Sequence, residues 1–183
     1  MQDPDTYFDF ADNALFLGIP HFFDVTSNMT FLLAGILGLS NLWGQRQKMT
    51  SIIYWSAWIF SCGAFLLCFG SGYFHWEPMR DALVWDRLPM TLCFSSMIVL
   101  LIADRVGQGG LWLIYIVLLV GGVITAWGAN YGYKDLRPYI VLQFGSILIA
   151  IYLLLFHKEN LVRQKTLWLL LGLYITAKIF EGF

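Results

Sequence analysis

The sequence predicts an all-α protein, a polytopic transmembrane helical bundle in which residues 1–183 form a single domain. Two observations favour this class. Hydrophobic residues make up 58% of the chain and charged residues only 13%, whereas soluble domains carry about 25% charged residues. Apolar runs of span length also recur along the whole chain, each ending at glycine, proline or charged residues. A bilayer suits this composition better than water does.

The individual spans follow from the lengths of these runs. Crossing about 30 Å of hydrocarbon takes roughly 20 mostly apolar helical residues. After a polar N-terminal tail, residues 1–25, we expect six spans at 26–43, 52–73, 88–103, 111–127, 139–156 and 167–180. No alternation of apolar and polar residues with a period of two indicates strands.

Basic residues predict the orientation. One set of loops contains Arg46, Lys48, Arg105, Lys158, Arg163 and Lys165, and the other Arg80, Arg87, Lys134, Arg137 and Lys178. The N-terminal tail has no Lys or Arg. Because basic loops are retained in the cytoplasm, we expect an integral membrane protein with its N-terminus on the outer side, in the periplasm or an organelle lumen. A net charge of −1 and the lack of a clustered basic face argue against nucleic-acid partners.

The main candidate site lies where the second span ends and the third begins. Ser71 and His75 are four residues apart and share one face of a helix. Asp86, at the predicted start of the third span, would then lie at the same depth as His75. A neutral imidazole can bind zinc, a carboxylate can accept a proton and a hydroxyl can stabilise an oxyanion. The pattern is compatible with a metal-assisted hydrolase. It is equally compatible with interfacial loop residues in which Asp86 pairs with Arg80 or Arg87.

Two other clusters are expected on the same outer side. Thr26 or Ser27 can cap the first span, and Asn28 can bond to a neighbouring span. Residues 134–139, KDLRPY, offer Arg137 as a partner for Asp135 or Asp86 or for lipid headgroups. The acidic residues of the tail, which could contribute to a calcium site, are Asp3, Asp5, Asp9 and Asp12.

Several motifs resemble the alkaline ceramidase family, especially its bacterial members, within the superfamily of membrane hydrolases that includes adiponectin receptors. The motifs are GSGYFH, WDRLPMT, DLRPY and IPHFFDVTSNMTFLLAGILGL. The resemblance extends from about Asp12 to the C-terminus. It implies a seven-helix bundle whose zinc is bound by three histidines, with His75 as one metal ligand and Ser71 and Asp86 as catalytic residues. The implied reaction is hydrolysis of the amide of ceramide or a related N-acyl lipid to a sphingoid base and a fatty acid.

The sequence departs from the family pattern at its C-terminus. The family's other two histidines form H-x-x-x-H on a seventh span, and the printed chain stops before such a motif. Its remaining histidines are His21, on the outer side, and His157, at the opposite end of the fifth span. We therefore expect either a zinc-dependent amidase acting on a membrane lipid or a catalytically inactive bundle that binds lipid or a partner.

Overall fold

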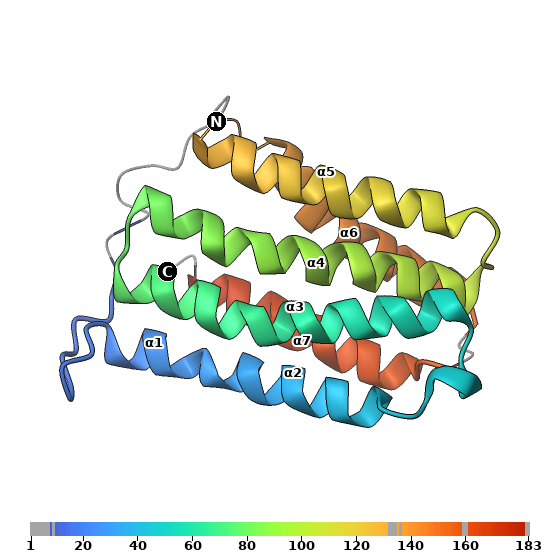
Figure 1. Cartoon of the computed structure of the whole chain (residues 1–183), viewed down its shortest axis with the longest axis horizontal. Coiled ribbons are helices and arrows are strands. Elements are labelled where there is room, and N and C mark those ends of the chain that lie inside the picture. Colours follow the sequence, from blue (N-terminus) through green and yellow to red (C-terminus); the bar gives the residue numbers. More distant parts are fainter. Residues whose placement is uncertain (1–7, 9, 132–134, 136, 159–160, 182–183) are drawn as a thin grey trace.

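The described part of the chain is helical (Figure 1). The computed structural model describes residues 8, 10–131, 135, 137–158 and 161–181. Its helices are α1 (Phe22–Ser27), α2 (Met29–Leu42), the short 3₁₀ helix η2 (Arg46–Lys48), α3 (Ser51–Trp76), α4 (Arg80–Arg105), α5 (Leu111–Tyr131), α6 (Arg137–Phe156) and α7 (Gln164–Glu181). The predicted all-α bundle is confirmed.

Among the described residues, five helical segments are long and apolar enough to cross a membrane: Phe22–Leu42, Ser51–Trp76, Arg80–Arg105, Leu111–Gly128 and Arg137–Phe156. This makes the fold compatible with an integral membrane protein. The sixth expected span, 167–180, falls on helix α7, which is not one of these five. The remaining predicted spans coincide with helices that extend beyond them at one or both ends.

Helix α4 extends eight residues beyond the predicted start of the third span, residue 88. Helix α4 begins at Arg80, so Asp86 and Arg87 lie within the helix and not at its start. Hydropathy marks only the apolar part of a helix, whereas backbone hydrogen bonding continues through polar residues at the membrane interface. The predicted tail is also too long, because α1 begins at Phe22.

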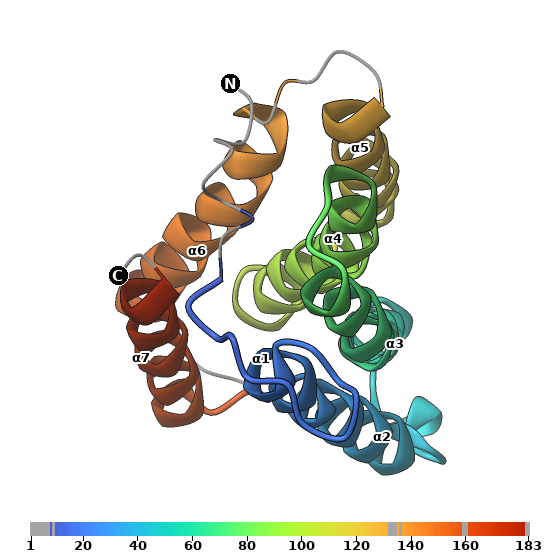
Figure 2. The same ribbon diagram turned by 90° about the vertical axis from the view of Figure 1, so that its left-hand side faces the viewer.

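Helix α4 occupies the centre of the bundle. It packs against α3, α5 and α6, while α2 packs on the other side of α3 and α7 packs along α6. In the end-on view the helices form an open arc, with α2 near α3 at one side and α7 beyond α6 at the other (Figure 2). The residues of the candidate site therefore lie on the helix pair with the most extensive packing, α3 and α4.

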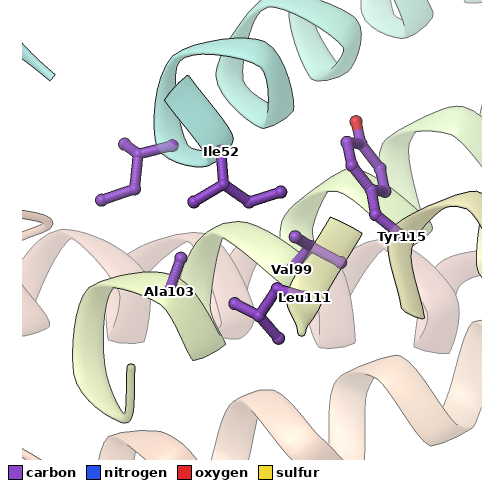
Figure 3. Close-up of a cluster of buried hydrophobic side chains, with 6 residues drawn as sticks. Ile52, Val99, Ala103, Leu111 and Tyr115 are labelled. Carbon is purple, nitrogen blue, oxygen red and sulfur yellow. The ribbon is translucent and has the colours of Figure 1, made fainter. Parts of the chain in front are cut away.

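The largest apolar cluster lies at the opposite end of the bundle from the candidate site. It joins α3, α4 and α5 through Ile52, Ile53, Val99, Ala103, Leu111 and Tyr115 (Figure 3). The Tyr115 hydroxyl and the Ser96 hydroxyl are 2.7 Å apart and form a buried hydrogen bond. This bond satisfies the polar end of an otherwise apolar side chain, as burial requires.

Asp104 and Arg105 fix the connection between α6 and α7 at the same end. The buried carboxylate of Asp104 accepts hydrogen bonds from the backbone N–H of Leu161 at 2.7 Å and of Val162 at 3.4 Å. The guanidinium of Arg105 donates to the carbonyl of His157 at 3.0 Å and to that of Val162 at 3.1 Å. These four bonds hold the start of α7 against the end of α4.

Candidate functional site

Ser71 and His75 occupy the last two turns of α3. The helix continues to Trp76, three residues beyond the predicted span, so both side chains project from regular helix. Ser71 is buried, with 7% of its surface exposed, and 26% of the His75 side chain is exposed. The expected shared face is therefore present, with the hydroxyl one turn deeper in the bundle than the imidazole.

Along the axis of α3, Asp86 lies at the height of Gly70, the residue beside Ser71. His75 lies five residues further along α3, a distance of about 7.5 Å at about 1.5 Å per residue. A Cβ atom built on Gly70 would lie 2.0 Å from the Trp85 carbonyl oxygen and 3.4 Å from the Asp86 backbone nitrogen. Asp86 therefore lies deeper than the sequence predicts.

Pro89 explains why the two helices meet at this carbonyl. Proline has no backbone N–H, so Pro89 cannot donate to the Trp85 carbonyl four residues earlier. Gly70 has no side chain to block the approach of α3 to the same carbonyl. The two residues together bring the backbone of Asp86 against the turn that carries Ser71.

The Asp86 side chain lies on the inner face of α4. Asp86, Met90 and Cys93 follow helical spacing and share one face of the helix. The Met90 sulfur accepts a hydrogen bond from the Tyr139 hydroxyl on α6, and the Cys93 sulfur would be 2.8 Å from a Cβ atom on Gly63 of α3. The face shared by these residues is therefore directed towards α3 and α6. The structure thus places Ser71, His75 and Asp86 on two packed helices at one end of the bundle.

Asp24 of α1 also lies at the site, in addition to the predicted residues Ser71, His75 and Asp86. One of its carboxylate oxygens lies 3.9 Å from His75 Nδ1, which is beyond hydrogen-bonding distance. Nδ1 itself is buried and has no hydrogen-bond partner among the described residues. Packing of α1 against α3 produces this approach. The position of Asp24 on the expected outer side was the only signal of it in the sequence.

Phe10 is a second residue that the sequence analysis missed. Its ring centroid lies 4.8 Å from that of His75, 5.3 Å from that of His21 and 5.5 Å from that of Phe74. Figure 2, which looks onto this end of the bundle, shows the N-terminal segment running between α6 and the pair α1 and α3. No periodicity marks a residue outside a helix as part of a site, so the sequence could not indicate this contact.

The other two histidines differ in position. His21 is near the site but directs Nδ1 to the carbonyl oxygen of Asp12. The N–H of Nδ1 donates this bond, which leaves Nε2 as the acceptor nitrogen of a neutral ring. His157 follows the end of α6, beside the cluster of Asp104 and Arg105, and is remote from His75 as expected.

The first additional polar cluster does not cap the first span. The hydroxyl of Thr26 donates to the Phe22 carbonyl at 2.6 Å, and that of Ser27 donates to the Asp24 carbonyl at 2.8 Å. Asn28 also bonds backwards, to the Asp24 carbonyl at 2.8 Å, and its side chain makes no cap bond to α2. The predicted capping and inter-span bonds are wrong because α1 starts earlier, at Phe22, so that Thr26 and Ser27 lie at its end and Asn28 lies between α1 and α2.

The second additional cluster is partly described. Arg137 pairs with Asp135 at 2.7 Å, which confirms one of its expected partners. Hydrogen bonds from Arg137 hold the pKa of the Asp135 carboxyl well below its usual range. Lys134 lies outside the described residues. Of the four acidic residues considered for calcium, Asp3, Asp5 and Asp9 also lie outside them.

A zinc ligand set is incomplete within the described residues. The buried Nδ1 of His75, which has no hydrogen-bond partner among the described residues, fits a metal ligand in the neutral tautomer that carries its proton on Nε2, because Nδ1 then has a lone pair to share. A catalytic zinc, however, uses three protein ligands. No group of three His, Cys, Asp or Glu side chains that could bind one ion occurs in the part of the chain that the structure describes. We therefore derive no chemical step from a bound metal.

A groove of about 660 Å³ lies on the outer face of the same helices. Three of its α3 residues, Leu66, Phe69 and Tyr73, are on the opposite face of the helix from Ser71 and His75, and the fourth is Gly70. All nine lining residues are apolar, aromatic or glycine. The groove is therefore an apolar surface on the other side of α3 from Ser71 and His75.

Comparison with known proteins adds no family assignment, since the chain matches no protein-family model, no curated protein and no solved structure.

Proposed function

We propose that this protein is a ceramidase-like membrane amidase that hydrolyses the amide bond of ceramide or a related N-acyl lipid. The observation that carries the proposal is the grouping of three side chains: His75, whose buried Nδ1 has no hydrogen-bond partner among the described residues, buried Ser71 one turn away, and Asp86 on the helix packed against them. Unpaired polar atoms at this depth are costly and are usually retained for a purpose. The motifs around these residues resemble the alkaline ceramidases, which supports the same reaction.

Each of the three side chains has a distinct task in amide hydrolysis. Water adds to the carbonyl carbon, the C–N bond breaks, and the products are a fatty acid and a sphingoid amine. Asp86 accepts the proton of the water and delivers it to the leaving nitrogen. The hydroxyl of Ser71 donates a hydrogen bond to the oxyanion. If zinc is bound, the imidazole of His75 would be one of its ligands, and the metal would lower the pKa of the attacking water.

The membrane supplies the substrate in this proposal. Five long apolar helices are compatible with an integral membrane protein, and N-acyl lipids are constituents of bilayers. The distribution of Lys and Arg among the loops supports an inner-membrane location with the N-terminus and the site on the periplasmic side. The acyl chains would remain in the hydrocarbon while the amide reaches the level of Ser71.

The test combines metal content with product release. The purified protein in detergent is analysed for zinc and incubated with ceramide, with another N-acyl lipid and with an ester of the same acyl chain. We expect stoichiometric zinc and fatty acid release from the amides, both lost in His75→Ala and retained in His157→Ala, the matched histidine at the far end. Absence of zinc and of hydrolysis in the wild-type protein contradicts the amidase proposal.

A second candidate is a non-enzymatic bundle that binds lipid or a partner. The observation that favours it is the arrangement of the histidines: His21 is bonded to the backbone of Asp12 and His157 is at the other end. Native mass spectrometry distinguishes the two candidates. Intact N-acyl lipid retained by a zinc-free protein supports the second candidate, whereas stoichiometric zinc contradicts it.

A further inference from the structure

The strap, which we define as residues 10–21, crosses the end of the bundle at which α1 begins and α3 ends (Figure 2), and His75 lies in the last turn of α3. Phe10 packs on the imidazole of His75 with ring centroids 4.8 Å apart and ring planes 43° apart. It also packs edge-on against His21 at 5.3 Å. One aromatic ring of the strap therefore contacts two imidazoles that are 54 residues apart in the sequence.

The strap is anchored to the ends of α3 and α4 by apolar contacts. Phe74, Ala82 and Leu83 form a buried cluster, and Phe8 and Phe10 pack against it. The ring of Phe10 meets that of Phe74 at 5.5 Å and 82°, an edge-to-face geometry that aromatic pairs favour. Phe10 thus has a defined position next to His75.

Asp12 holds the other part of the strap. Its carboxylate accepts backbone hydrogen bonds from Ala14 at 2.9 Å, Phe23 at 2.8 Å and Asp24 at 3.1 Å. The last two are N–H groups of the first turn of α1, which have no partner within the helix. Because His21 makes no side-chain cap bond, Asp12 replaces the missing cap and ties the strap to α1.

The environment of His75 indicates what the strap does. Nδ1 of His75 is buried even though 26% of the side chain is exposed. Polar atoms of a partly exposed ring normally find water, so a neighbouring group must cover this edge. Phe10 is the aromatic residue of the strap that lies against this ring.

We propose that the strap is part of the site: Phe10 positions the imidazole of His75 and shields it from bulk water, and Asp12 keeps the strap in place. A ligand that binds the ring face covered by Phe10 must first displace Phe10. The inference goes beyond the proposed reaction, since it concerns access to the imidazole and holds for any ligand bound there.

Chemical modification of histidine tests the proposal without any activity assay. Diethyl pyrocarbonate transfers an ethoxycarbonyl group to an unprotonated imidazole, and peptide mass spectrometry resolves the three histidines. In Phe10→Ala we expect the modification rate of His75 to rise up to about fourfold, as its exposed fraction grows from 26% towards that of an open side chain. The rate of His157 should not change.

Three further variants complete the test. Phe16→Ala removes another ring of the strap, one that packs on Phe22 and not on His75. Phe10→Tyr keeps an aromatic ring over His75. In both variants His75 should be modified at the wild-type rate. Asp12→Ala should raise the His75 rate because it releases the strap without altering the aromatic contact residues. If Phe10→Ala does not fold, all three histidines should react faster in it. The modification rate of His75 in Asp12→Ala then tests the proposal. An unchanged His75 rate in folded Phe10→Ala, or in Asp12→Ala after such unfolding, overturns the proposal.

Discussion

Substitution of Gly70 tests the close packing of α3 and α4 that brings Asp86 to the level of Ser71. In Gly70→Ala the new Cβ atom would lie 2.0 Å from the Trp85 carbonyl oxygen and 2.8 Å from its carbon. Both neighbours are backbone atoms of a helix and cannot rotate away. Cβ contacts below 3.0 Å essentially never occur, so the two helices must separate locally by about 1 Å.

The expected loss of stability follows from two opposing terms. Overpacking of this kind costs about 1–3 kcal/mol, whereas replacing glycine by alanine within a helix gains up to about 1 kcal/mol. Gly72 is the matched control, because a Cβ atom there has no neighbour within 4 Å. Gly72→Ala should therefore be neutral or stabilising, and Gly70→Ala should be less stable than this control by about 1–3 kcal/mol.

The assay is unfolding in mixed detergent micelles with rising sodium dodecyl sulfate, followed by circular dichroism. The free energies of unfolding of Gly70→Ala and Gly72→Ala are compared with that of the wild type. If the two variants unfold at the same denaturant fraction, α4 does not approach Gly70 as described, and the placement of Asp86 beside Ser71 is wrong.

Three other changes test the contacts around the site and at the far end. Asp104→Ala should lower the free energy of unfolding by about 1.5–3 kcal/mol, because the N–H of Leu161 loses its charged acceptor; an unaltered transition would contradict this bond. Tyr174→Phe removes the hydroxyl that accepts from Gln143 at 2.8 Å and should cost about 0.6–2 kcal/mol, measured in the same micelles, with no additional loss in the double variant Gln143→Leu, Tyr174→Phe. Backbone hydrogen bonds, that of Ala14 first, lower the pKa of Asp12 below its usual 3.8. The ionised carboxylate of Asp12 therefore stabilises the strap fully at pH values above 3.8. This stabilisation is lost as the pH falls through the lower pKa that Asp12 has in the folded protein. Hydrogen exchange of the strap, corrected for intrinsic rates, should be slow at neutral pH and fast once Asp12 is protonated, and equal protection at both extremes would refute the role of its carboxylate.

The sequence by itself determined the class of fold, because span length and composition reflect a solvent requirement that acts on each helix separately. The spacing of Ser71 and His75 also sufficed to place them on one face, since i and i+4 are neighbours in any helix. The orientation in the membrane and the amidase reaction stay predictions. The ends of the helices could not be predicted as well from the sequence. The charged residues around Asp86 are typical of a loop, whereas in the structure they belong to α4, which begins at Arg80.

Only the tertiary structure decided which residues from separate segments meet at His75. The depth of Asp86 depends on a carbonyl that Pro89 cannot bond and on the absence of a side chain at Gly70. Asp24 approaches His75 because α1 packs on α3. Phe10 covers the imidazole because Asp12 bonds across the start of α1. These contacts join residues that no local period relates, and their geometry is set by packing between elements, which a hydropathy pattern does not encode.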